Sequence, residues 1–168
     1  MSSQQIPWIH GYDWLQVTSS IVRTVSIMGA EVQTLKGLAL DISLEYQGID
    51  SQMEELCKKS CISCTDICCV RATVWYDLKD LLVIYLSTGG LPGRQIYRDE
   101  AKACCHLTAS GCRLPRSERP FICTWYICAE QKKLLSPSSV PGPSLSGEIE
   151  KIKGLRNNLE TRYIAFSS

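Results

Sequence analysis

The sequence lacks the features that would point to a membrane or secreted protein. None of its apolar runs reaches the roughly 18 residues that a membrane-spanning helix needs. The first residues, Met1 to Pro7, have neither the basic region nor the apolar region of a signal peptide. We therefore expect a cytoplasmic protein with no membrane partner.

Strong charge of one sign is also missing, and so are the common catalytic motifs. The formal net charge is +1, so nucleic acid is not an expected partner. There is no G-x-S-x-G elbow, H-E-x-x-H helix or phosphate-binding loop. A thiol enzyme would need a base beside its cysteine, and His106 is the only histidine near one. The motifs leave it open whether the protein is an enzyme.

Cysteine, in contrast, is abundant and confined to one part of the chain. The sequence has ten cysteines, all between positions 57 and 128: Cys57, Cys61, Cys64, Cys68, Cys69, Cys104, Cys105, Cys112, Cys123 and Cys128. A disulfide framework would usually be spread over the chain. In a reducing cytosol, clustered cysteines indicate metal binding or catalysis.

The spacing of the first cysteines favours a metal. Cys57, Cys61, Cys64 and Cys68 are separated by 4, 3 and 4 residues, which would place them on one face of a helix. Cysteine is also a small buried apolar residue, so this stripe alone could be core. A second set follows at positions 104–128, however, and two distant sets of thiolates can close a tetrahedral zinc site or hold an iron–sulfur cluster.

Apolar periodicity predicts a mainly α fold, in which helical N- and C-terminal segments surround an irregular, metal-bound, cysteine-rich module. The expected segments are an N-terminal helical region (1–56), the cysteine module (57–132), a Ser/Pro/Gly-rich linker (133–145) and a C-terminal helix (146–168). We see no internal repeat.

Within these segments the expected helices are short to medium in length. One begins at an Asp13 cap and ends near Gly29, and a second carries Leu35, Leu40 and Leu44 on its apolar positions. Gly37 and Gly48 should break the second pattern, so that a third helix begins near residues 49–51. Further helices are expected over about 77–87, directly after Pro120, and over about 146–164, where the apolar stripe includes Leu155.

Several pieces of the cysteine module resemble a known family. They are Cys61-x2-Cys64 with Cys68-Cys69, then Cys104-x2-Leu107 with Gly111-Cys112, then Arg119-Pro-x2-Cys123. Together, over roughly residues 57–128, they are similar to the YkgJ-type family, also called the CxxCxxCC family of zinc- or iron-chelating domains. This chain has three residues between Cys64 and Cys68 where the family usually has two.

The resemblance implies a set of metal ligands and a function. The implied ligands are Cys61, Cys64, Cys68, Cys69, Cys104, Cys112 and Cys123, with Arg119 beside the bound group. A related module in flagellin lysine N-methylase favours an iron–sulfur cluster, including the [4Fe–4S] form, over zinc. The expected function is a cysteine-cluster metal-binding protein with a structural, electron-transfer or redox-sensing role. The alternative is a partner or component of a protein-modifying, methylase-like enzyme.

Overall fold

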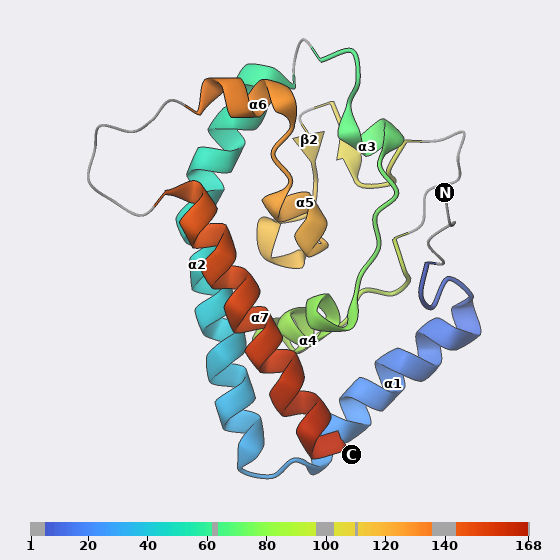
Figure 1. Cartoon of the computed structure of the whole chain (residues 1–168). Helices are drawn as coiled ribbons and strands as arrows, with labels where there is room; N and C mark the ends of the chain where they lie inside the picture. The colour runs from blue at the N-terminus through green and yellow to red at the C-terminus, as the bar shows by residue number, and fades with distance from the viewer. Residues whose placement is uncertain (1–5, 62–63, 97–102, 110, 136–143, 168) are drawn as a thin grey trace.

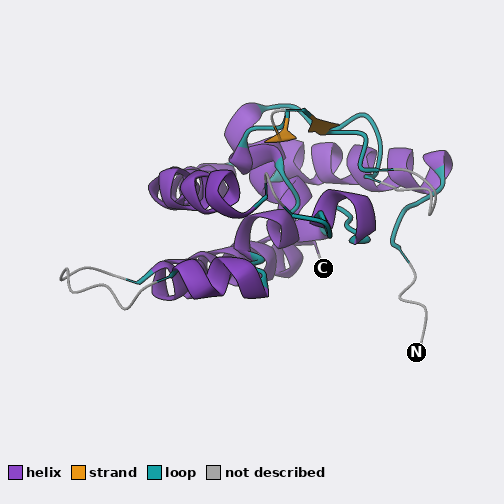
Figure 2. Ribbon diagram, turned by 90° about the horizontal axis from the view of Figure 1, so that it is seen from above, coloured by secondary structure: helices purple, strands orange, loops and turns teal. Residues whose placement is uncertain are grey.

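The chain folds into a mainly helical structure, as the sequence predicts (Figures 1 and 2). The computed structural model describes residues 6–61, 64–96, 103–109, 111–135 and 144–167. Its helices are α1 (Gly11–Ile27), α2 (Glu31–Ser60), α3 (Cys68–Arg71), α4 (Leu78–Thr88), α5 (Phe121–Trp125), α6 (Ala129–Leu134) and α7 (Leu145–Ser167), with a 3₁₀ turn η1 (Arg116–Glu118). Strands β1 (Leu107–Thr108) and β2 (Gly111–Cys112) pair antiparallel. No helix within the described ranges is long and apolar enough to cross a membrane.

The longest helix, α2, runs without a break from Glu31 to Ser60, so the predicted interruption and the predicted third helix are wrong. Its buried residues alternate at spacings of 4 and 3 along its whole length: Leu35, Ala39, Ile42, Tyr46, Ile49, Met53 and Leu56. Gly37 and Gly48 lie on the exposed face, as do Leu40 and Leu44, which the sequence pattern had placed on the apolar stripe. Packing of a continuous buried stripe offsets the roughly 1 kcal/mol that each glycine costs a helix.

Helices α2, α4 and α7 pack against one another and form the core of the fold. In Figure 1, α7 lies along α2, and α4 lies beside both. Helix α4 is buried on most of its surface, as expected for an apolar central helix. It begins at a capping box between Asp77 and Asp80 and ends at Gly89, whose φ of 78° is in the left-handed region. The sequence predicted this helix and its glycine stop correctly.

The first helix, α1, begins earlier than predicted. Its N-cap is His10, three residues before the predicted Asp13 cap, and Asp13 lies inside the first turn, where its negative charge faces the free N–H groups. Trp14 is buried, and its indole N–H donates to the carbonyl of Pro92 at 3.1 Å. The loop that follows α4 is thereby attached to α1.

The cysteine stripe does not lie on one helix, and this part of the prediction is wrong. Helix α2 ends at Ser60, so that Cys57 is helical, Cys61 is the C-cap, and Cys64 lies in a non-helical segment. Cys68 begins the separate short helix α3. Helix α6, which the sequence did not predict, packs against α2 (Figure 1). Most of the predicted linker, residues 136–143, lies outside the described residues.

A cation occupies the middle of the apolar stripe of α7. Arg156, rather than the predicted Leu155, joins Ile149, Ile152 and Leu159 on the buried face. Only 2% of Arg156 is exposed. Its guanidinium bonds Tyr46 Oη at 3.1 Å, Asp77 Oδ1 at 3.0 Å and Asp80 Oδ1 at 2.8 Å. A buried charge needs such partners, and here α2 and α4, the other two core helices, supply them.

Candidate metal centre

Four cysteines from four separate segments lie near one another and form what we call the first cysteine group. They are Cys69 in α3, Cys104 in the loop before β1, Cys112 in β2 and Cys123 in α5. The Cys104 N–H donates to the carbonyl of Cys69 at 2.7 Å, which fixes the loop against α3. Leu107, whose N–H donates to Cys104 at 3.0 Å, is the strand partner of Cys112. The small hairpin therefore brings Cys112 back towards Cys104.

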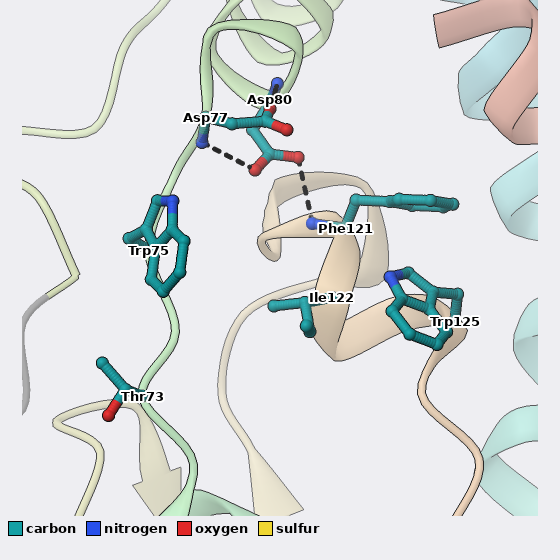
Figure 3. A pocket seen from close by; sticks show the side chains of 7 residues that line it. All are labelled: Thr73, Trp75, Asp77, Asp80, Phe121, Ile122 and Trp125. Carbon is teal, nitrogen blue, oxygen red and sulfur yellow. Dashed lines mark hydrogen bonds between the residues drawn. The ribbon is translucent and has the colours of Figure 1, made fainter. Parts of the chain in front are cut away.

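The fourth member, Cys123, is held by the helical core. Pro120 begins α5, and the N–H of Phe121 donates to Asp80 Oδ1 at 2.9 Å (Figure 3). The same carboxylate accepts the Asp77 N–H and pairs with Arg156. Asp80 is only 3% exposed. The first turn of α5, and with it Cys123, is therefore anchored to α4 and α7.

The thiols of this first group are close enough to influence each other electrostatically. Burial raises the pKa of Cys69, and the neighbouring thiols of Cys104 and Cys112 raise it further. Loss of hydration raises the pKa of Cys123 to about 12, with Cys69 and Cys112 adding to the effect, although part of its side chain stays exposed. A cation placed among these thiols would reverse that mutual repulsion.

A second set of cysteines lies at the end of α2, at the start of α6, which packs on α2, and at the start of α3, and we call it the second cysteine group: Cys57, Cys61, Cys68 and Cys128. Cys57 and Cys61 are one helical turn apart, and the Cys61 N–H donates to the carbonyl of Cys57 at 2.8 Å. Burial raises the pKa of Cys68, and the nearby thiols of Cys128 and Cys61 raise it further. Cys64 follows closely, with its N–H donating to the carbonyl of Cys61 at 3.3 Å.

The adjacent pair Cys68 and Cys69 divides the two groups. Both residues lie in the first turn of α3, where successive side chains point about 100° apart. Cys68 has Cys128 as its strongest thiol neighbour, whereas Cys69 has Cys104. Cys69 is also influenced by Cys68 and Cys61, so the two groups are neighbours, and the ligand set that the resemblance implies stays a prediction.

In the described part of the chain, no three Cys, His, Asp or Glu side chains are already arranged around a point as ligands of one ion. The backbone contacts above nevertheless bring Cys69, Cys104 and Cys112 into neighbouring positions.

The arginine predicted beside the bound group instead contacts α2. Arg119 donates to the carbonyl of Leu114 at 2.8 Å and to Glu54 Oε1 at 3.3 Å. Arg116, which the sequence analysis did not single out, is 5% exposed and bonds Asp50 and Glu54 on α2. These pairs hold η1, between the cysteines of β2 and α5, on the long helix.

His106, the histidine near the cysteines in the sequence, also has a partner among the loop residues. Arg113 Nε lies 3.2 Å from His106 Nδ1. Loss of hydration lowers the pKa of His106, and the charges of Arg113 and Arg94 lower it further. A neutral imidazole is therefore favoured, with one nitrogen already engaged.

A small open cleft of about 200 Å³ lies beside α5, lined by Thr73, Trp75, Asp77, Asp80, Phe121, Ile122 and Trp125 (Figure 3). It is smaller than the roughly 300 Å³ at which ligand pockets usually begin. Its two carboxylates both pair with Arg156. We assign this cleft a structural role at the junction of α4 and α5.

Two contacts of the second cysteine group were missed by sequence reasoning. Gln131, 5% exposed, accepts the Cys128 N–H at 3.1 Å through Oε1 and donates through Nε2 to Cys57 Sγ at 3.5 Å. The Cys128 thiol in turn accepts the Gln131 N–H in a capping box. The spacing of Cys128 and Gln131, an N-cap and its N3 position, is the sequence signal that could have indicated this.

Comparison with protein-family models, with curated proteins and with solved structures finds no match to this chain. The resemblance to the CxxCxxCC family therefore depends on the motif pieces alone and stays a prediction.

Proposed function

We propose that this chain is a metal-binding cysteine-cluster protein whose first cysteine group holds an iron–sulfur cluster or zinc. The observation that carries the proposal is the meeting of Cys69, Cys104, Cys112 and Cys123, which come from four segments and share no helix. Four thiolates are the complete ligand set of a [4Fe–4S] cluster or of a structural zinc ion. All four also belong to the ligands that the family resemblance implies.

An iron–sulfur cluster is the favoured occupant. Each iron of a [4Fe–4S] cluster takes one thiolate, so the four cysteines are held farther apart than the ligands of a single zinc ion. Cys69, Cys104, Cys112 and Cys123 come from four separate segments and could supply one thiolate to each iron. The resemblance to the methylase module favours the same choice.

The proposed role is to stabilise the loops and to exchange electrons or sense redox state. The metal would join α3, the hairpin and α5, so its binding energy would be part of the folding energy of this region. Cys123 and Cys105 have exposed side chains. An oxidant or redox partner could therefore approach the group from solvent.

Anaerobic purification and metal analysis test the proposal. Wild-type protein should be brown and contain iron and acid-labile sulfide, and dithionite should reversibly bleach it. Colourless protein with one firmly held zinc would select the zinc form. Metal-free protein after expression with supplied iron and zinc would refute the proposal.

Matched variants test the ligand assignment. Cys69→Ser and Cys123→Ser should each lose the bound group, whereas Cys105→Ser should keep it. Cys105 is a suitable control because it is exposed and directly adjacent to Cys104. Retention in both ligand variants would show that the assignment is wrong.

A further inference from the structure

A groove of about 570 Å³ lies between α1 and the loop that follows α4. This volume is within the range of roughly 300–1,000 Å³ that is usual for binding pockets in proteins. The α1 wall extends from Trp14 to Ser26, which is about 18 Å along the helix. In Figure 1, α1 lies apart from the cysteine-bearing elements α3, β2 and α6, and none of the described residues that line the groove is a cysteine. The groove is therefore not part of either cysteine group.

The two walls of the groove are fixed to each other. The indole N–H of Trp14 on one wall donates to the carbonyl of Pro92 on the other. Farther along the loop, the buried side chain of Gln95 donates to the carbonyl of Pro7, just before α1, at 3.0 Å. Gln95 also accepts the N–H of Tyr76 at 2.7 Å, which fixes the loop to the segment before α4. Because these bonds set the shape of the groove in advance, a partner would lose little binding energy to ordering it.

Exposed apolar side chains lie along the α1 wall. Leu15 is 63% exposed and Val22 is 41% exposed, and the two lie two turns apart on the same face of the helix. The hydroxyls on this wall are already bonded, since Thr18 donates to the carbonyl of Trp14 at 2.8 Å and Ser26 to that of Arg23 at 2.7 Å. The wall therefore suits an apolar surface better than a polar one.

The α1 wall favours a helical partner over an extended one. Only side chains face the groove from this wall, because the N–H and C=O groups in the middle of a helix bond each other. An extended peptide would leave its own backbone groups unpaired on that side. A helix satisfies its backbone internally and can place apolar residues at positions i, i+3 or i+4, and i+7 against Leu15 and Val22. The small side chain of Ser19, between them, would let such a helix approach closely.

The charge in the groove distinguishes between possible partners. Arg23 is exposed, makes no ion pair within the described part of the chain, and is the one charged residue among the described residues that line the groove. A second copy bound symmetrically would place two Arg23 side chains in one interface, with no carboxylate from the groove to pair with them. A membrane-surface helix usually carries several basic residues, whereas α1 has only Arg23. An acidic residue on a partner protein, in contrast, would pair with Arg23.

We propose that the groove between α1 and residues 91–93 is a docking site for an amphipathic helix of another protein, with an acidic residue of that helix placed against Arg23. Apolar contact with Leu15 and Val22 would supply most of the affinity, and the ion pair would set the direction of the bound helix. This inference goes beyond the proposed function, because the groove would bind its partner with or without a metal in the cysteine module.

A synthetic peptide tests the proposal on the full-length protein. The probe is a fluorescein-labelled, helical, amphipathic peptide whose leucines are spaced by three and four residues and are flanked by glutamates. A second peptide has lysines in place of the glutamates and is otherwise identical. Fluorescence anisotropy should show saturable binding of the acidic peptide. The basic peptide should bind about fivefold more weakly, the difference that an exposed ion pair can make.

Matched variants locate the binding. Leu15→Ser should weaken binding of the acidic peptide by about 10- to 100-fold, as expected for loss of a leucine that the partner buries. Leu40→Ser should leave it unchanged, because Leu40 is 53% exposed but lies on α2, outside the groove. Arg23→Glu should reverse the preference, so that the basic peptide binds more tightly. Helix content by circular dichroism should be the same in all three variants, because the replaced side chains are exposed.

Other results would overturn the proposal. Absence of saturable binding of the acidic peptide, or equal binding by Leu15→Ser and the wild type, would show that the groove does not dock a helix. Dimerisation in sedimentation experiments that Leu15→Ser abolishes would make a second copy the occupant. Co-sedimentation with phosphatidylserine vesicles that the same variant abolishes would make the groove a membrane site. Metal-free protein that still binds the acidic peptide would refute the proposed function and leave this inference in place.

Discussion

Replacing Arg156 by methionine should destabilise the protein by about 3–5 kcal/mol, the typical cost of leaving a buried charge without its partner. Arg156 is 2% exposed, and the Asp80 carboxylate that faces it at 2.8 Å is 3% exposed. Methionine fills a similar volume, so the loss is electrostatic and not one of packing. The variant also removes the bond to Tyr46 and the contact with the ring of Phe121, 4.5 Å from the guanidinium carbon.

Urea unfolding followed by circular dichroism measures this loss, at a fixed metal content and with an unchanged m-value. Arg162→Met on the same helix is the matched control, because Arg162 is about half exposed and lies 3.5 Å from Glu31. It should cost no more than about 1 kcal/mol. The double variant Arg156→Met/Asp80→Asn should recover part of the loss, because it replaces the unpaired carboxylate of Asp80 by a neutral amide. A cost for Arg156→Met equal to that of Arg162→Met would refute the reasoning.

Other predictions concern the glycines and the metal. Gly48→Ala should raise the stability of the chain by about 0.5–1 kcal/mol, because Gly48 is exposed in mid-helix with open space around it. Gly89→Ala should lower stability, because its φ is +78°, and thermal melts of the two variants should shift in opposite directions. Burial raises the pKa of Cys69, Cys104 and Cys123, so each should release a proton on binding Zn²⁺. A zinc ion held by all four thiolates of the first group displaces up to four protons, so its apparent affinity should fall by up to about 10⁴-fold for each unit of decrease below about pH 7. Competition titrations showing no pH dependence would contradict this.

Local signals in the sequence were sufficient to predict several helices, but they did not predict the length of α2. Asp77 caps the start of α4 and Gly89 ends it. Both are local interactions, so they can be predicted from the sequence near each end of the helix. Gly37 and Gly48 appeared to be breaks because propensity weighs each residue alone. The stripe that continues through them is buried by α4 and α7, which a local pattern does not contain.

The grouping of the cysteines lay outside what spacing could predict. A 4-3-4 repeat suggests one helix face, but α2 ends at Ser60, before the repeat is complete. Cys68 and Cys69 are neighbours in sequence and yet face different partners, a consequence of the turn of α3. Likewise, Arg156 occupies a regular position in the buried stripe of α7. Because it is charged, a pattern based on apolar residues did not include it.

The buried carboxylate of Asp80 connects the two halves of this structure. It pairs with Arg156 inside the helical core. It also accepts the N–H of Phe121 and so holds the first turn of α5, which carries Cys123. One ligand of the first cysteine group is thus positioned by the core, whereas Cys104 and Cys112 depend on loop and hairpin hydrogen bonds. Chelation of the metal should therefore loosen the hairpin before α5, and α5 before the core helices. Hydrogen exchange that instead shows α4 and the hairpin losing protection together would mean that the metal and the core fold as one unit.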